Sequence, residues 1–467
     1  MRERRARELI TWTTMIRSLL RRALNHYEAI VILLILILSI AQAAHNILSL
    51  GYIGQDYEQH RTVLEKTATS GISFTSSSPP ALYLLGAAVR ALAPQDWRME
   101  WISFALVMIN SCALLGWYQL LRVLVPSTPL RIAAFLLLVF LPVRTIHTTV
   151  FAADALTVIP LLLAAVMIVA QVRARTWAAQ FLYALGVGLA CCLGLFTKYT
   201  FLLLPAGCAL LYVFWAFRPT PLRWKAIFLT TGLIGALIPS SLFGLWIWGQ
   251  MKASNNVWIN NAQEGRGMEW RDVFLVKTKD IEILRGPDFV CGQPMTASTG
   301  HSYPALLHLG TFSDVWNFFQ DPSQEILRQR TLIGNSFGRE RTPLSKTLTP
   351  LSLALSIPIT VIAFIGSLIQ MARATWSTFK TPTLRSDLIC ALGVLSAAYA
   401  APSIGGLPYY WAVYIYGFWT PRLVFPSLLT AISLGFSAIS PSTPKRWFSV
   451  SILAYSIILS LLYLLTL

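Results

Sequence analysis

Apolar runs about twenty residues long recur along this chain, and they constrain its fold more than any other feature. Each run can cross a hydrocarbon core of about 30 Å. The 467 residues are 55% hydrophobic and 12% charged, whereas soluble domains carry about 25% charged residues. We therefore expect an all-α polytopic membrane protein with about eleven transmembrane helices. The expected spans are residues 29–50, 101–121, 131–150, 155–172, 177–196, 200–217, 226–248, 350–371, 387–404, 420–439 and 446–466.

Basic residues predict the orientation of these spans. Arginines cluster before the first span and favour a cytoplasmic N-terminus. The even-numbered connections would then be cytoplasmic too, and they are short and basic. The compact loops favour a bacterial inner (plasma) membrane. The arginines before the first span are Arg2, Arg4, Arg5, Arg7, Arg17, Arg21 and Arg22; the basic residues of the inner connections are Arg122, Arg131, Arg173, Arg175, Arg218, Arg223, Lys225, Arg373, Lys380, Arg385, Lys445 and Arg446.

Two long connections divide the chain into three parts. We expect residues 1–248 to form an N-terminal transmembrane module with a first outer loop at 51–100. Residues 249–349 would form a large outer loop, and residues 350–467 the C-terminal transmembrane helices. Gly and Pro interrupt the helical patterns of the large loop. We expect both long outer loops to carry short helices lying on the membrane. One ambiguity remains at Thr197-Lys198-Tyr199, where two expected spans could form one long bent helix.

The net charge of +17 does not indicate a nucleic-acid partner. The Lys and Arg residues lie mainly in short connections between apolar runs, where they set topology and meet anionic lipid headgroups. Membrane lipids are therefore the expected partners of this charge. The six cysteines show neither a disulfide framework nor metal-ligand spacing.

Ionisable residues gather at four places that all map to the outer side. Asp56 follows the first span, in a segment with Tyr57, Glu58 and His60. Asp154, Lys198 and Arg422 lie in or beside later outer turns. Charged groups at membrane depth are costly and so mark functional sites by default. The cations suit a phosphate, and the acids suit a general base or a divalent metal.

Each of these residues also has a structural interpretation. Asp56 could be a solvated loop carboxylate, and Asp154 could cap the following helix. Lys198 could extend to the interface, and Arg422 could anchor its helix there. The histidines His60, His301 and His308 have no metal-ligand spacing and favour a packing role.

Five segments resemble elements of a known superfamily. Ser77–Leu85 looks like a Pro-Pro-Leu-Tyr-Tyr element, Phe151–Leu156 like a second acidic turn, and Gly194–Thr200 like a Leu-Thr-Lys-Tyr segment. Tyr303–His308 and Phe312–Asp314 are similar to parts of a large outer loop. In this order, the chain resembles the GT-C superfamily of glycosyltransferases that use polyprenyl-phosphate-linked sugars, such as protein mannosyltransferases and aminoarabinose transferases. The resemblance covers the order of elements over nearly the whole chain.

The resemblance implies an inverting displacement on the outer face. The donor would be a polyprenyl-phosphate sugar, and the acceptor an unidentified lipid, glycan or protein. Asp56 would take a proton from the acceptor, while Lys198 and Arg422 would stabilise the leaving phosphate. Asp154 would orient the acceptor, Asp56 or a metal. The other substrate-binding candidates are Tyr57, His60 and Tyr199.

The chain departs from the superfamily pattern in two places. Many members have two adjacent acids in the first loop, but here Tyr57 separates Asp56 from Glu58. Ser78 stands where many members have His or Asn before the Pro pair. A metal requirement is therefore open: no cofactor is certain, and a divalent metal would have Asp56 and Glu58 as its candidate ligands.

Two other functions fit the same outer charges. One is a transporter or flippase of a lipid-linked molecule, and the other is a non-catalytic subunit built on the same scaffold. A transporter would be expected to show inverted repeats and polar groups near the midplane, whereas the polar groups singled out here map to one side.

Overall fold

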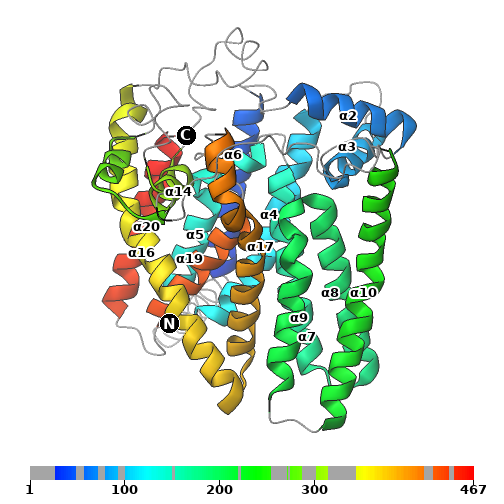
Figure 1. Ribbon diagram of the computed structural model, residues 1–467. Coiled ribbons are helices and arrows are strands. Elements are labelled where there is room, and N and C mark those ends of the chain that lie inside the picture. Colours follow the sequence, from blue (N-terminus) through cyan, green and yellow to red (C-terminus); the bar gives the residue numbers. More distant parts are fainter. Residues whose placement is uncertain are drawn as a thin grey trace, which may run out of the picture.

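The computed structural model describes residues 27–48, 57–71, 79–92, 100–149, 153–218, 222–253, 271, 274–286, 301–313, 343–414, 424–440 and 446–466. Within these residues every regular element is a helix, and the longest helices run side by side as a bundle (Figure 1). This confirms the prediction of an all-α polytopic membrane protein.

The helices fall on the predicted spans. In the part of the chain that the structure describes, 8 helices are long and apolar enough to cross a membrane, or 9 if one bent pair counts as a span. The two remaining predicted ranges, 226–248 and 420–439, overlap further helices. The bundle consists of Tyr27–Leu48, α4 (Glu100–Leu124), α5 (Thr128–Phe140), α6 (Pro142–Thr149), α7 (Val158–Arg173), α8 (Trp177–Thr197), α9 (Leu204–Ala216), α10 (Leu222–Ala253), α16 (Pro343–Lys380), α17 (Leu384–Tyr414), α19 (Phe425–Ile439) and α20 (Arg446–Thr466).

The predicted span 131–150 is a bent pair rather than one straight helix. Helices α5 and α6 meet at an angle of 46°. Pro142 has no backbone N–H and cannot continue the hydrogen-bond ladder of α5. Leu141, with ψ of 122°, has already left the helical conformation. The bend carries the buried residues of α6 towards the turn that holds Asp154.

The segment around Lys198 separates two spans. Helix α8 ends at Thr197, Lys198 is extended (φ −160°, ψ 139°), and the 3-10 helix η2 (Tyr199–Leu203) leads into α9. The ring of Phe201 lies against Gly194, only 2.7 Å from the place that a Cβ would occupy there. Two helices therefore exist where one long bent helix was the alternative.

The basic connections meet at one end of the bundle, which we call the basic end. Arg131 pairs with Glu28 at 2.6 Å, so the starts of Tyr27–Leu48 and α5 lie together. The hydroxyl of Ser437 donates to the Leu124 carbonyl at 3.0 Å, and Arg385 donates to Ser437 at 3.0 Å. These contacts join the ends of α4 and α19 to the start of α17. The alternation of spans inferred from charge is thus consistent with the fold, and a cytoplasmic basic end stays a prediction.

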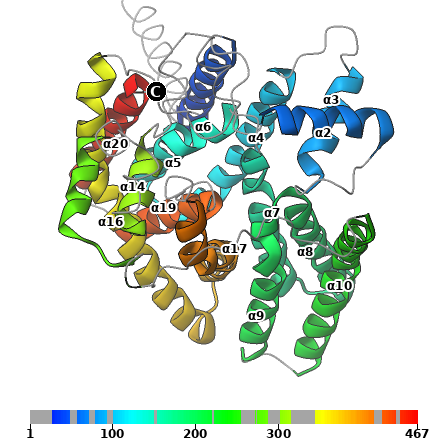
Figure 2. The same cartoon turned by 45° about the horizontal axis from the view of Figure 1, so that its top comes forward.

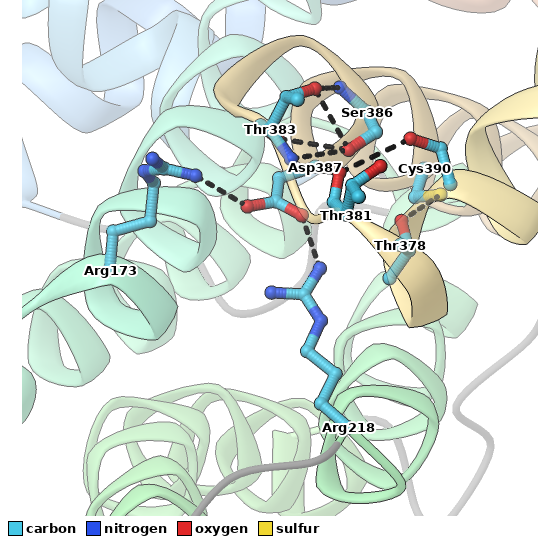
Figure 3. Close-up of polar contacts among 9 residues, drawn as sticks. Arg173, Arg218, Thr378, Thr381, Thr383, Ser386, Asp387 and Cys390 are labelled. Atoms are coloured by element: carbon cyan, nitrogen blue, oxygen red, sulfur yellow. Dashed lines mark hydrogen bonds and ion pairs between the residues drawn. The ribbon is translucent and has the colours of Figure 1, made fainter.

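Asp387 fastens three segments together at the basic end (Figure 3). Its buried carboxylate accepts from Arg173, at the end of α7, at 3.0 Å, and also from Arg218, which follows α9. Thr383 and Ser386 exchange hydrogen bonds of 3.0 and 3.1 Å between side chains and backbone N–H groups, and so cap the start of α17. A buried carboxylate needs such partners to offset its lost hydration.

Short helices gather at the opposite end. From the first outer loop come α2 (Tyr57–Ser70) and α3 (Ala81–Leu92), which pack on each other and beside α4 (Figure 2). From the large outer loop come η3 (Thr278–Arg285) and α14 (Tyr303–Phe312), which contact α16; α14 also contacts α6. Both loops therefore carry short helices, as predicted, and their position at the membrane surface stays a prediction.

Candidate functional site

Asp154 lies in the turn that leads into α7. The 3-10 helix η1 (Ala153–Leu156) forms this turn. Thr157 donates its hydroxyl to the Asp154 carbonyl at 2.6 Å, and Asn110 of α4 donates Nδ2–H to the Ala155 carbonyl at 3.0 Å. The N-cap residue of α7 is Thr157. Asp154 therefore does not occupy the N-cap position of α7, and its side chain is only 1% exposed.

The carboxylate of Asp154 forms an ion pair with Lys198. The ammonium of Lys198 donates to Asp154 Oδ1, and 16% of the lysine side chain is exposed. The lysine reaches this position because the chain is extended between α8 and η2, while its own N–H still bonds the Gly194 carbonyl at 2.8 Å. Interfacial extension alone does not describe Lys198, because the side chain is directed to a buried carboxylate. The structure thus brings together two residues that the sequence placed in separate turns.

The first outer loop covers this turn. Leu64 of α2 and Leu82 and Tyr83 of α3 form one apolar cluster with Ala155 and Leu156 of the Asp154 turn. The hydroxyl of Tyr83 also lies 2.7 Å from Nδ1 of His60, which joins the first turns of α2 and α3 by a hydrogen bond. The N-terminal end of α2, which directly follows Asp56 in the sequence, is held to the body that contains Asp154 and Lys198.

The other predicted site residues have different outcomes. Asp56 and Arg422 lie outside the described residues, as do the side chains of Tyr57 and Glu58. Tyr199 begins η2, and its ring meets that of Phe243 of α10 edge-on, with centroids 6.5 Å apart. Among the residues that the structure describes, no three potential metal ligands lie together. A metal bound by Asp56 and Glu58 stays a prediction.

Sequence reasoning missed a buried arginine beside this site. Arg144 of α6 is 2% exposed. Its Nε–H donates to Asn110 Oδ1 at 3.1 Å, and its Nη1 donates to the Ser39 hydroxyl at 2.5 Å and to the Val139 carbonyl at 2.7 Å. The signal was available, because an arginine inside an apolar run is costly and marks a functional hypothesis.

Two histidines of the large outer loop have structural partners. His308 of α14 donates Nε2–H to the Leu353 carbonyl at 3.0 Å and pairs Nδ1 with the Thr360 hydroxyl at 2.8 Å. His301 Nδ1 lies 3.4 Å from Asp280 Oδ1. Burial lowers the pKa of His301, and the neighbouring Asp280 carboxylate only partly opposes this shift. These contacts agree with the packing role expected for both residues.

The comparisons with known proteins give a distant likeness. No family model and no curated protein matches the chain. Among solved structures, ArnT from Cupriavidus metallidurans bound to undecaprenyl phosphate is 14% identical, with a TM-score of 0.41 over 87% of this chain and 77% of that one. The same ArnT in the apo state is 12% identical, with a TM-score of 0.40 and the same coverage. A likeness this distant does not identify a reaction, so any function must be inferred from the residues and contacts of this chain.

Proposed function

We propose that this protein is a GT-C-like glycosyltransferase, which moves a sugar from a polyprenyl-phosphate donor to an acceptor on the outer face. The observation that carries the proposal is the buried Asp154–Lys198 pair, covered by the helices that follow Asp56. The order of the motifs along the sequence supports the same class. The N-terminus would be cytoplasmic, and a bacterial inner membrane is the expected location.

Lys198 has the properties of a group that stabilises a leaving phosphate. The donor phosphate carries one negative charge while it is joined to the sugar, and it gains a second as the anomeric C–O bond breaks and the oxygen keeps the electron pair. An ammonium already fixed in place needs little reorganisation as that charge grows. Asp154 fixes Lys198 in this way, and 16% of the lysine side chain is exposed. Arg422 would supply a second cation.

Asp56 is the proposed general base. It would take the proton from an acceptor hydroxyl or amine, whose oxygen or nitrogen then attacks the anomeric carbon opposite the departing phosphate. One displacement of this kind inverts the anomeric configuration. General-base help typically contributes about 10²–10⁴-fold. Tyr57, His60 and Tyr199 would contact the substrates, and residues 249–349 would select the acceptor.

Sugar release from radiolabelled polyprenyl-phosphate sugars tests this proposal. The purified protein in lipid is compared with Asp56→Asn and with the control Glu65→Gln, which neutralises a half-exposed carboxylate of the same first loop. We expect Asp56→Asn to lose at least 100-fold in rate, at the lower end of general-base effects, and Glu65→Gln to keep the wild-type rate. Full activity of Asp56→Asn would exclude Asp56 as the general base. Donor binding without sugar release by the wild type would favour a flippase or a non-catalytic subunit.

A further inference from the structure

Arg144 is a guanidinium without a carboxylate partner among the residues that the structure describes. Its three hydrogen bonds go to an amide, a hydroxyl and a backbone carbonyl. A buried charge of this kind in a membrane protein is expensive. Its contacts therefore indicate what the residue is for.

Two of the contacts serve the bend between α5 and α6. The carbonyls at the end of α5 lose their helical partners because the helix stops before Pro142. Nη1 of Arg144 donates a hydrogen bond to one of these carbonyls, that of Val139. It also donates to the Ser39 hydroxyl of the first span. Neither of these two contacts involves the turn that contains Asp154.

The third contact does reach the Asp154 turn. A guanidinium can only donate, so Arg144 Nε–H must face the amide oxygen of Asn110. The amide nitrogen of Asn110 must then point the other way, where it donates to the Ala155 carbonyl at 3.0 Å. Asn110 and Ala155 are both fully buried. Arg144 thus selects the one orientation of Asn110 that anchors the backbone next to Asp154.

We propose that Arg144 and Asn110 are positioning residues for the Asp154–Lys198 pair. The inference rests on the proposed function, because it assigns these residues to the placement of the ammonium that faces the donor phosphate. Their contact sequence is Arg144 Nε, Asn110 Oδ1, Asn110 Nδ2 and the Ala155 carbonyl. Neither residue touches the substrates.

Asn110→Asp separates positioning from folding. The carboxylate keeps an acceptor for Arg144 but has no N–H for the Ala155 carbonyl. We expect an unfolding temperature at or above that of the wild type. The kcat for sugar release should fall by about 10- to 100-fold, since a misplacement of about 1 Å can cost about 100-fold. The KM for the donor should change less than kcat. Ser39→Ala removes another acceptor of the same guanidinium, and we expect its kcat to stay at the wild-type value. Unchanged kcat in Asn110→Asp would overturn the inference.

A second readout works without turnover. The energetic coupling between Asp154 and Lys198, measured from unfolding of single and double variants, should fall in an Asn110→Asp background. Unchanged coupling there would refute the positioning role, whereas a wild type that releases no sugar would refute only the proposed function. If Asn110→Asp does not fold, Arg144→Leu/Asn110→Leu replaces the buried polar pair by apolar groups, which proteins often tolerate. The same losses of kcat and coupling are expected, and normal values would count against the inference.

Discussion

Asp154 and Lys198 illustrate how much one buried charge depends on its partner. The Asp154 side chain is 1% exposed, so the lysine ammonium takes the place of lost water. Arg61 and Glu65 of α2 form a contrasting pair, with 47% and 46% of their side chains exposed. Breaking a buried pair by removing one partner costs about 3–5 kcal/mol. Exposed pairs contribute about 0.2–1 kcal/mol.

A double-variant cycle should therefore separate the two pairs. We expect Asp154→Asn and Lys198→Gln each to lower the unfolding temperature strongly, and the double variant to lose less than the sum of the two. The coupling should lie within about 0.5–3 kcal/mol, as for contacting residues. The same cycle on Arg61→Gln and Glu65→Gln serves as the control, with almost additive effects. Additive effects at Asp154 and Lys198 would mean that the buried contact contributes nothing.

Prediction at the residue level rested on one physical rule. Asp154 and Lys198 were singled out because charged residues at membrane depth are costly, but the sequence held no information that they would meet across 44 residues. Arg144 obeys the same rule and was overlooked inside an apolar run. Asp387 was missed because it follows a basic connection, where a carboxylate looks solvated, yet the fold buries it between two arginines.

At the scale of elements, two short breaks position the site. The Asp154 turn separates α6 from α7, and Lys198 separates α8 from η2. The second break depends on close contact between Gly194 and Phe201. The length of the apolar runs predicted where the helices lie, because a span must match the membrane. It did not predict the bend at Pro142, or that α16 runs from Pro343 to Lys380, since neither is set by membrane thickness.

Gly194→Ala should disturb the Lys198 turn. Its Cβ would lie 2.7 Å from the Phe201 ring, so the ring and the adjoining η2 must move. Overpacking of this kind typically costs about 1–3 kcal/mol. We expect a lower unfolding temperature and weaker binding of polyprenyl phosphate, measured by titration in lipid nanodiscs. Gly244→Ala in α10 is the matched control, because nothing lies within 4 Å of its Cβ, and it should bind normally. Wild-type affinity in Gly194→Ala would show that this turn does not hold the phosphate.

For the whole molecule, the two ends of the bundle have different constructions. At the basic end, ion pairs hold the helices to each other. Asp387 pairs with Arg173 and Arg218, and Glu28 pairs with Arg131. The opposite end carries the short helices of both outer loops (Figure 1). The Asp154 turn packs against two of these helices, α2 and α3, and Asp154 pairs with Lys198. The alternation of basic connections in the sequence was sufficient to assign connections to one end of the bundle or the other. The arrangement of the outer loops was not predictable, because their helices depend on contacts with the bundle.

Labelling with a membrane-impermeant maleimide tests the orientation. Single cysteines are introduced at the exposed positions Ser70→Cys, at the end of α2, and Thr381→Cys, between α16 and α17. Cys291 and Cys112, which is exposed on α4, are replaced by serine in both variants. We expect intact cells to label Ser70→Cys and Thr381→Cys to be labelled only in permeabilised cells, because the positive-inside rule predicts a cytoplasmic basic end. Labelling of Thr381→Cys in intact cells would show that the orientation is the opposite of the predicted one.

The fate of the donor during turnover distinguishes a transferase from a flippase or a non-catalytic subunit. The purified wild-type protein in lipid receives a polyprenyl-phosphate sugar of known anomeric configuration and a membrane extract as the source of acceptor. Released polyprenyl phosphate and transferred sugar are counted, and the product anomer is assigned by NMR. We expect one lipid phosphate to be released per sugar transferred, and the product to have the inverted configuration. A retained configuration would contradict the single displacement, and a donor that stays intact would contradict the assignment as a transferase.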